Sequence, residues 1–314
     1  MNAAAEKSSR QQKDPERQAR VGAAYALGAF GIWGFIPVYY KAVAEVPLLE
    51  LLAHRTLWSM MFVAATIIIA DRHNAVRALL WNPRLLVKMF GTAAILAINW
   101  LIFIWAIAND QVLQSSLGYY INPLVNVILG YFFLNERLNG LQMGAVALAA
   151  VGIAIPVVGL GEFPWIALSL AGTFGMYGLL RKTADIDAVT GLFVETVLLA
   201  PVALVFLVYW NIAGGAVFTE RGLGLDALIV ASGVATALPL ILFTQAAQRL
   251  RLGTVGFFQY LAPTCHFALA VFLYGEAFTP HHLATFALIW TALAIYITDT
   301  VRQSRKRRQG ASAW

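Results

Sequence analysis

Two charged side chains interrupt apolar stretches of this sequence that are long enough to cross a membrane. Arg55 lies in the stretch 48–70, and Glu195 lies in the stretch 189–210. Such charges are costly, because insertion scales give about 2.5–3.5 kcal/mol for an arginine at the centre of a spanning helix. Three interpretations are open: the two form an ion pair, they bracket a zwitterionic substrate, or Glu195 takes up a coupling proton. His54 is a second candidate for proton coupling, since imidazole exchanges a proton near neutral pH.

Polar side chains also form stripes on two further apolar stretches. Within 112–134 they recur at spacings of four, three and four, on one helical face: Ser115, Tyr119, Asn122 and Asn126. The equivalent face of 253–274 carries Gln259, Ala262 and His266. Such stripes either hydrogen-bond neighbouring helices or line a substrate cavity. Their matched positions favour the cavity.

Prolines and aromatic residues extend this candidate site. Pro123 and Pro263 lie within the two striped stretches, where each is either a hinge or a fixed packing kink. Aromatic side chains within apolar stretches either pack in the core or line an apolar pocket. The pocket candidates are Trp33, Trp100, Tyr120 and Tyr260, together with the amide of Asn99 beside Trp100.

The composition identifies the environment that must surround these residues. The chain is 60% hydrophobic and only 12% charged, whereas soluble domains carry about 25% charged residues. Membrane lipid is therefore the expected partner of most of its surface. The net charge of +6 resides in the tails and short loops, a pattern of membrane topology and not of nucleic-acid binding. A single cysteine, Cys265, gives no basis for a disulfide or a metal site.

Chemical motifs of enzymes do not occur in this sequence. It contains no HExxH, GxSxG or GxxxxGK pattern, so we expect neither an enzyme nor an ATP-driven pump, and no cofactor. A carrier for a small-molecule substrate is the favoured function. A passive channel and a membrane receptor remain alternatives, and the oligomeric state is open.

Ten apolar stretches are long enough to be spanning helices, and they predict an all-α polytopic membrane protein. They run near 22–41, 48–70, 88–108, 112–134, 140–159, 163–181, 189–210, 223–247, 253–274 and 280–300. The polar tails, 1–20 and 302–314, are expected to be disordered. With a cytoplasmic N-terminus, every Lys and Arg falls on the cytoplasmic side except Arg55 within a helix and Lys41 and Arg221 outside. This bias predicts that both termini are cytoplasmic.

The two halves of the chain, 21–159 and 160–301, share a pattern. Tyr120, Pro123, Leu129, Phe132 and Glu136 recur 140 residues later as Tyr260, Pro263, Leu269, Phe272 and Glu276. Because each half has five helices, the second half must enter the membrane from the opposite side. Two inverted five-helix repeats of this kind are typical of carriers that work by alternating access.

Several segments resemble the RarD subgroup of the EamA family, within the drug/metabolite transporter superfamily. The resemblance is carried by GIWGFIPVYYK, HRTLWS, NWLIFIWAI, SLGYYINPLVN and RLRLGTVGFFQYLAPT, with ET at 195–196 and YGE at 274–276. It covers roughly residues 20–300. It implies a multi-pass protein of the bacterial inner membrane that exports small metabolites. From this we expect efflux of amino acids or drug-like compounds, with proton exchange as the driving force.

Overall fold

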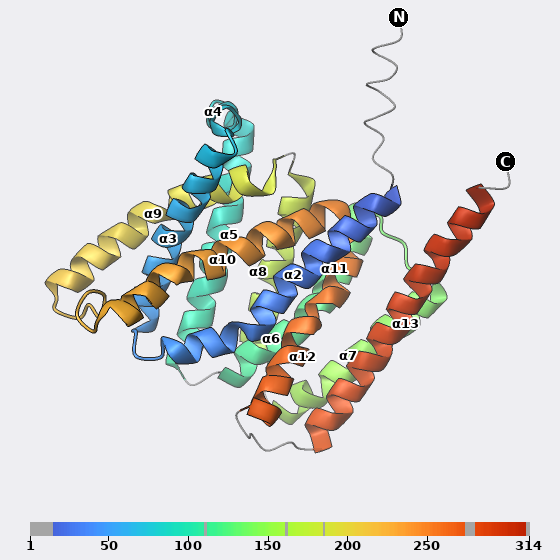
Figure 1. Cartoon of the computed structure of the whole chain (residues 1–314). Coiled ribbons are helices and arrows are strands. Elements are labelled where there is room, and N and C mark those ends of the chain that lie inside the picture. The colour runs from blue at the N-terminus through green and yellow to red at the C-terminus, as the bar shows by residue number, and fades with distance from the viewer. Residues whose placement is uncertain (1–14, 110–111, 161–162, 185, 274–279, 312–314) are drawn as a thin grey trace, which may run out of the picture.

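The computed structural model of the chain describes residues 15–109, 112–160, 163–184, 186–273 and 280–311. All regular structure in these residues is helical (Figure 1). The elements are α2 (Pro15–Ala42), α3 (Leu48–Ile69), α4 (His73–Leu80), α5 (Pro83–Ala108), α6 (Val112–Leu134), α7 (Gly140–Leu160), α8 (Trp165–Thr183), α9 (Ala188–Ile212), α10 (Leu223–Arg249), α11 (Leu252–Gln259), α12 (Leu261–Ala268), the π-helix η1 (Leu269–Leu273) and α13 (Pro280–Ala311).

Within the described residues, nine helical stretches are long and apolar enough to cross a membrane. They correspond to α2, α3, α5, α6, α7, α9, α10, α13 and a combined stretch, Leu252–Leu273, which joins α11, α12 and η1. The remaining long helix, α8, lies where a tenth span is predicted. It carries Arg181 and Lys182 in its last turn and is not among the nine. The architecture is that of a polytopic α-helical membrane protein.

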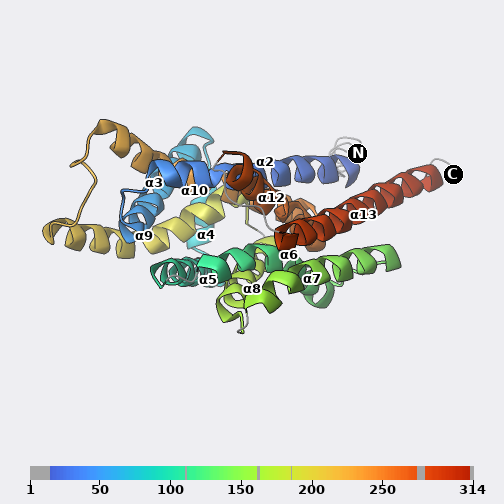
Figure 2. The same cartoon turned by 90° about the horizontal axis from the view of Figure 1, so that it is seen from below.

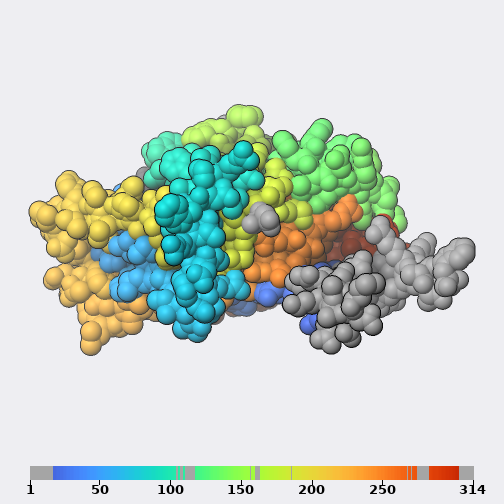
Figure 3. Space-filling model, turned by 90° about the horizontal axis from the view of Figure 1, so that it is seen from above, coloured from blue at the N-terminus to red at the C-terminus, as the bar shows by residue number. Residues whose placement is uncertain are grey.

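The structure departs from the sequence-based expectation at three places. Disorder is predicted for the polar tails, but α2 begins at Pro15 and α13 continues to Ala311, so parts of both are helical. A short helix, α4, which the apolar pattern does not predict, lies between α3 and α5 on the face seen in Figure 3. The ninth stretch is not one continuous helix, since it is interrupted at Tyr260, just before Pro263.

The helices form two layers, seen edge-on in Figure 2, with α5, α6, α7 and α8 in one and α2, α10, α11 and α12 in the other. The helix pairs in contact come in matched sets. Helix α6 packs on α8 in the same way that α11 and α12 pack on α2. Likewise, α5 packs on α8 and α9 in the same way that α10 packs on α2 and α3. Several further contacts, such as α3 on α9 and α6 on α11, join the first half of the chain to the second. The halves are therefore interleaved and do not form separate domains.

Four connections between helices contact one another at one end of the bundle. Arg72, after α3, donates to the Asp187 carboxylate before α9 at 2.7 Å. Gln248 Nε2, in α10, donates to the Ile186 carbonyl at 2.8 Å. Arg251 Nη2 donates to the Arg137 carbonyl after α6 at 2.5 Å. The links after α3, α6, α8 and α10 therefore share one face, and these are the links that the charge pattern assigns to the cytoplasm.

At each end of the bundle a glutamate accepts hydrogen bonds from backbone N–H groups of another segment. At this shared face Glu136, after α6, accepts the free N–H groups of Leu252 at 2.7 Å and Gly253 at 3.1 Å, which begin α11. At the other end Glu50, in α3, accepts the N–H groups of Val217 at 2.9 Å and Phe218 at 3.0 Å in the link before α10. Glu276, the repeat equivalent of Glu136, lies outside the described residues.

This arrangement predicts which links are labelled from each side of the membrane. In a Cys265→Ser background, Arg77→Cys in α4 should react with an impermeant maleimide only when the cytoplasmic face is accessible. Glu220→Cys, before α10, should react only from the other face, because both side chains are exposed and belong to opposite ends of the bundle. Labelling of intact cells and of inverted vesicles provides the measurement. Reaction of both cysteines from the same side would contradict the arrangement.

Candidate functional site

Side chains from both layers line one cavity in the described part of the protein. Its walls come from α2, α3, α5, α6, α8, α10, α11 and α12. Of the residues predicted to bind substrate, the lining contains Trp33, Arg55, Asn99, Trp100, Tyr119, Asn122, Gln259 and His266. The structure therefore brings most of the predicted residues together around one space between the two halves.

The remaining predicted residues lie elsewhere. Tyr120 packs against Phe286 of α13 with ring centroids 5.9 Å apart, and Tyr260 is buried beside Phe257. Asn126 is buried behind the cavity wall, where its amide nitrogen hydrogen-bonds Gln259 across the α6–α11 contact. The interpretation of the polar stripes as hydrogen bonds between helices thus applies to Asn126, while Asn122 and His266 line the cavity. The side chain of Ser115 lies outside the described residues.

Arg55 is a half-buried cation in the cavity wall. Its guanidinium carbon lies 4.2 Å from the centroid of the Trp100 ring, a cation–π contact. One of its Nη1 hydrogens is donated to the Tyr40 hydroxyl at 3.2 Å. Its buried Nε has no hydrogen-bond partner among the described residues. Arg55 is therefore held in position by an aromatic ring and a hydroxyl, neither of which carries a negative charge.

Amides and an imidazole supply most other polar groups of the wall. Asn99 donates to the Leu170 carbonyl at 3.0 Å and to the Thr173 hydroxyl at 2.8 Å, joining α5 to α8. His266 Nε2 lies 2.9 Å from the Trp33 carbonyl and joins α12 to α2. Asn122 Oδ1, in contrast, has no partner among the described residues. The two cross-links hold opposite halves together around the cavity, and Asn122 retains a free acceptor.

Aromatic rings make up much of the cavity surface. Trp33 meets Phe174 edge-on at a centroid distance of 5.7 Å, and it meets Phe30 at a tilt of 50° and a centroid distance of 5.5 Å. These rings belong to a larger buried cluster that includes Phe243. An apolar cavity with a few fixed polar groups is the usual form of a site for a small organic molecule.

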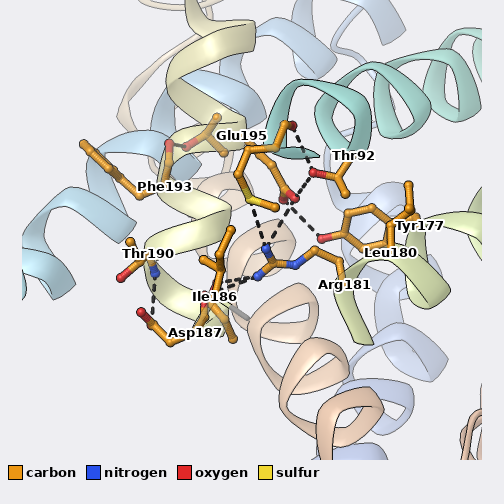
Figure 4. Close-up of polar contacts among 12 residues, drawn as sticks. Thr92, Tyr177, Leu180, Arg181, Ile186, Asp187, Thr190, Phe193 and Glu195 are labelled. Carbon is orange, nitrogen blue, oxygen red and sulfur yellow. Dashed lines mark hydrogen bonds and ion pairs between the residues drawn. The ribbon is translucent and has the colours of Figure 1, made fainter. Parts of the chain in front are cut away.

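Glu195 does not pair with Arg55, which corrects the first interpretation of these two charges. Both Glu195 and Arg181 are 0% exposed, and Arg181 Nη1 lies 3.7 Å from Glu195 Oε1 (Figure 4). Thr92 donates a hydrogen bond to the same oxygen at 2.6 Å, and the Tyr177 hydroxyl donates to the other at 3.3 Å. This cluster joins α5, α8 and α9, and Glu195 is not part of the cavity lining, so the two charges do not bracket that space either.

The pairing of Glu195 with Arg181 could not be predicted from the position of Arg181 in the sequence. Arg181 follows an apolar stretch and precedes Lys182, so the charge pattern assigns it to a cytoplasmic link. In the structure its guanidinium turns back into the protein, where Nη2 donates to the Ala188 carbonyl at 3.2 Å. Gly191 leaves the space, since a Cβ there would lie 2.0 Å from Arg181 Nη1. Glycine at 191 and glutamate one turn later are the only local signal of this arrangement.

His54 lies apart from the cavity lining. Its Nε2 is 3.8 Å from Glu50 Oε1, and its ring contacts Phe218 with centroids 4.6 Å apart. It therefore belongs to the group of residues that holds the link before α10. Its role in proton coupling stays a prediction.

The ion pair predicts a specific pattern of stability. Arg181→Met should lower the unfolding free energy by about 3–5 kcal/mol, because it leaves the Glu195 carboxylate buried without its cation. The double variant Arg181→Met, Glu195→Gln should recover much of this loss, since no uncompensated charge remains. Thermal unfolding in detergent provides the measurement, with the exposed Arg77→Met as the control. A double variant that is less stable than Arg181→Met would show that the carboxylate is stabilised mainly by other groups.

Comparisons with known proteins agree with this architecture. The sequence model of the EamA-like transporter family matches residues 20–158. An uncharacterized transporter of Vibrio cholerae is 45% identical over 296 residues, which cover 94% of this chain and 98% of that protein. Protein RarD of Salmonella typhi is 44% identical, covering 93% of this chain and 99% of that protein. A crystal structure that is 18% identical shares the fold, with a TM-score of 0.69 over 88% of this chain and 97% of the other.

Proposed function

This chain belongs to the RarD subgroup of the EamA-like transporter family, and we propose that it is a secondary carrier that exports small organic molecules. It is a multi-pass membrane transporter of the drug/metabolite type, as its relatives are. The observation that supports a carrier most directly is the cavity, whose polar groups and aromatic walls come from both halves of the chain. In a chain surrounded by lipid, such polar groups mark a substrate path more often than a packing surface.

The proposed mechanism is alternating access between two inverted five-helix repeats. In it α8 is the tenth span, both termini are cytoplasmic, and the first repeat coincides with the family match at 20–158. The matched helix pairs support this proposal. If each helix of one half is replaced by its counterpart in the other half, the contact of α5 with α8 becomes that of α10 with α2. In the same way, the contact of α6 with α8 becomes the contacts of α11 and α12 with α2. If the two repeats exchanged their conformations, the cavity would open to the opposite side of the membrane. Pro123 and Pro263 are the proposed hinges, the latter beside the interruption at Tyr260.

Export can be tested before the substrate is identified. Cells that overproduce the protein should accumulate one or more small metabolites in the medium, and cells that produce Trp33→Ala at equal membrane levels should not, because Trp33 lines the cavity. Untargeted metabolomics of the medium provides the measurement, with Trp81→Ala, at an exposed site, as the control. The compound found is then tested in proteoliposomes. Saturable flux with counterflow is expected of a carrier, whereas flux without either would indicate a channel.

Proton exchange is the proposed driving force, with Glu195 as the group that takes up the proton. Its support is the environment of this carboxylate: it is fully buried, and it contacts a cation and two hydroxyls from α5 and α8. A change in its charge would alter the α5–α8–α9 contact and so connect protonation to helix movement. The alternative is that Glu195 and Arg181 form a purely structural pair.

Replacement of Glu195 separates these two roles. Glu195→Gln can still accept a hydrogen bond from one of the Thr92 and Tyr177 hydroxyls and donate to the other, but it cannot release a proton. Counterflow at equal pH on both sides should persist, while net export should lose its dependence on an imposed pH gradient. The measurement is flux of the identified compound in proteoliposomes after a pH jump. Unchanged gradient dependence in the variant would remove Glu195 from the coupling mechanism.

A further inference from the structure

Arg55 is a cation in the cavity wall that has no anionic partner in the described part of the structure. Glu195, which also interrupts an apolar stretch, is paired with Arg181. Arg55 has the Tyr40 hydroxyl as its hydrogen-bond acceptor, and no Asp or Glu occurs among the described residues that line the cavity. Removing a guanidinium from water without a counterion is costly. The cavity wall therefore carries one positive charge that no carboxylate of its described lining neutralises.

The geometry of Arg55 suits one type of anion. A guanidinium has five N–H donors in a planar fork that matches both oxygens of a carboxylate. Tyr40 accepts from one of them, and Nε has no acceptor among the described residues. The Trp100 ring, 4.2 Å away, restricts the plane of the guanidinium, so less rotational freedom is lost when a ligand binds. The guanidinium is thus pre-oriented in the cavity wall. Its Nε is buried within the wall, so a ligand in the cavity would be bound through the Nη groups.

We propose that the cavity binds a monoanionic organic acid, with its carboxylate on Arg55 and an aromatic or apolar body against the rings of the wall. This inference rests on the proposed function, in which the cavity holds the transported molecule. A single cation matches a single negative charge, and a phosphate dianion would remain half neutralised. The described lining has no carboxylate to receive an ammonium group, so a neutral body is favoured over an amine or a zwitterion.

The other polar groups of the wall agree with a neutral body. His266 hydrogen-bonds the Trp33 carbonyl through Nε2, and the Asn99 amide nitrogen donates to α8, so these two nitrogens already have partners within the protein. Asn122 Oδ1 is buried in the wall without a donor among the described residues, so a rotation of this side chain would let it accept a hydrogen bond from a hydroxyl or N–H of the substrate. Trp33, Phe30 and Phe174 offer ring faces and edges on which an aromatic body packs.

Binding of a matched probe series to the purified full-length protein tests the inference. The probes are 3-phenylpropanoate, its amide 3-phenylpropanamide, the amine 3-phenylpropylamine and zwitterionic phenylalanine, measured by calorimetry in detergent at neutral pH. The wild-type protein should bind the anion at least about tenfold more tightly than each of the other three. Equal or tighter binding of the amine or the zwitterion, or no binding of the anion at millimolar concentration, would overturn the proposal. This comparison needs no variant.

Variants then assign the preference to Arg55. Arg55→Gln should weaken binding of the anion about tenfold or more and change binding of the amide less than about threefold. Arg55→Lys should keep part of the preference, since it retains the charge but not the fork. Arg77→Gln, which removes an exposed arginine of α4, is the matched control and should bind all four probes as the wild type does. A preference for the anion that survives Arg55→Gln would refute the assignment.

Failure of this inference is distinguishable from failure of the proposed function. Selective binding of the anion without counterflow in proteoliposomes would leave the site in place and contradict the carrier. Counterflow of a neutral or cationic compound, with no binding of the anion, would leave the carrier in place and contradict the site.

Discussion

The low polarity of a lipid membrane is the constraint on which the rest of this structure depends. A charge or an open backbone group within it must find a partner inside the protein. Glu195 pairs with Arg181, and Glu136 accepts the N–H groups at the start of α11, which have no partner within their own helix. These contacts join different helices, and the second joins segments far apart in the sequence. Buried ions therefore help to determine which helices lie together, and Arg55, which lacks an anionic partner among the described residues, indicates where a substrate is expected.

The two halves of the chain are interleaved because polar groups of one half find their partners in the other half. This interleaving also determines where the cavity lies. Glu136 at the end of α6 caps a helix of the second half, while Asn126 of α6 reaches Gln259 of α11. Helices α3 and α9, α6 and α11, and α7 and α13 are paired with their own equivalents. The cavity lies between the halves that these pairs join. In the proposed mechanism, a site between two repeats changes its exposure when the repeats move relative to each other.

The Arg181–Glu195 pair and Arg55 have different physical roles. Arg181 and Glu195 are surrounded by hydroxyls, carbonyls and a thioether, and Gly191 leaves the space that the guanidinium occupies. Arg55 faces a cavity and is supported by aromatic and hydroxyl groups. The first arrangement stabilises helix contacts and is a candidate for coupling to protons. The second arrangement is suited to selecting a ligand by charge.

The sequence by itself determined where the long helices lie and that Tyr119 and Asn122 share a helical face, because both are local properties. Apolar length defines a spanning helix, and a spacing of three places Asn122 on the same face as Tyr119. The tertiary structure decided which side chains meet. Local charge assigns Arg181 to a loop, whereas its burial depends on Gly191 and Glu195 of another helix. Asn126 falls behind the wall because the rotation of α6 is set by its packing against α11. Which side chains pair across helices depends on how the helices pack and on the free-energy cost of leaving a buried charge unpaired. The spacing of residues along one helix contains neither kind of information.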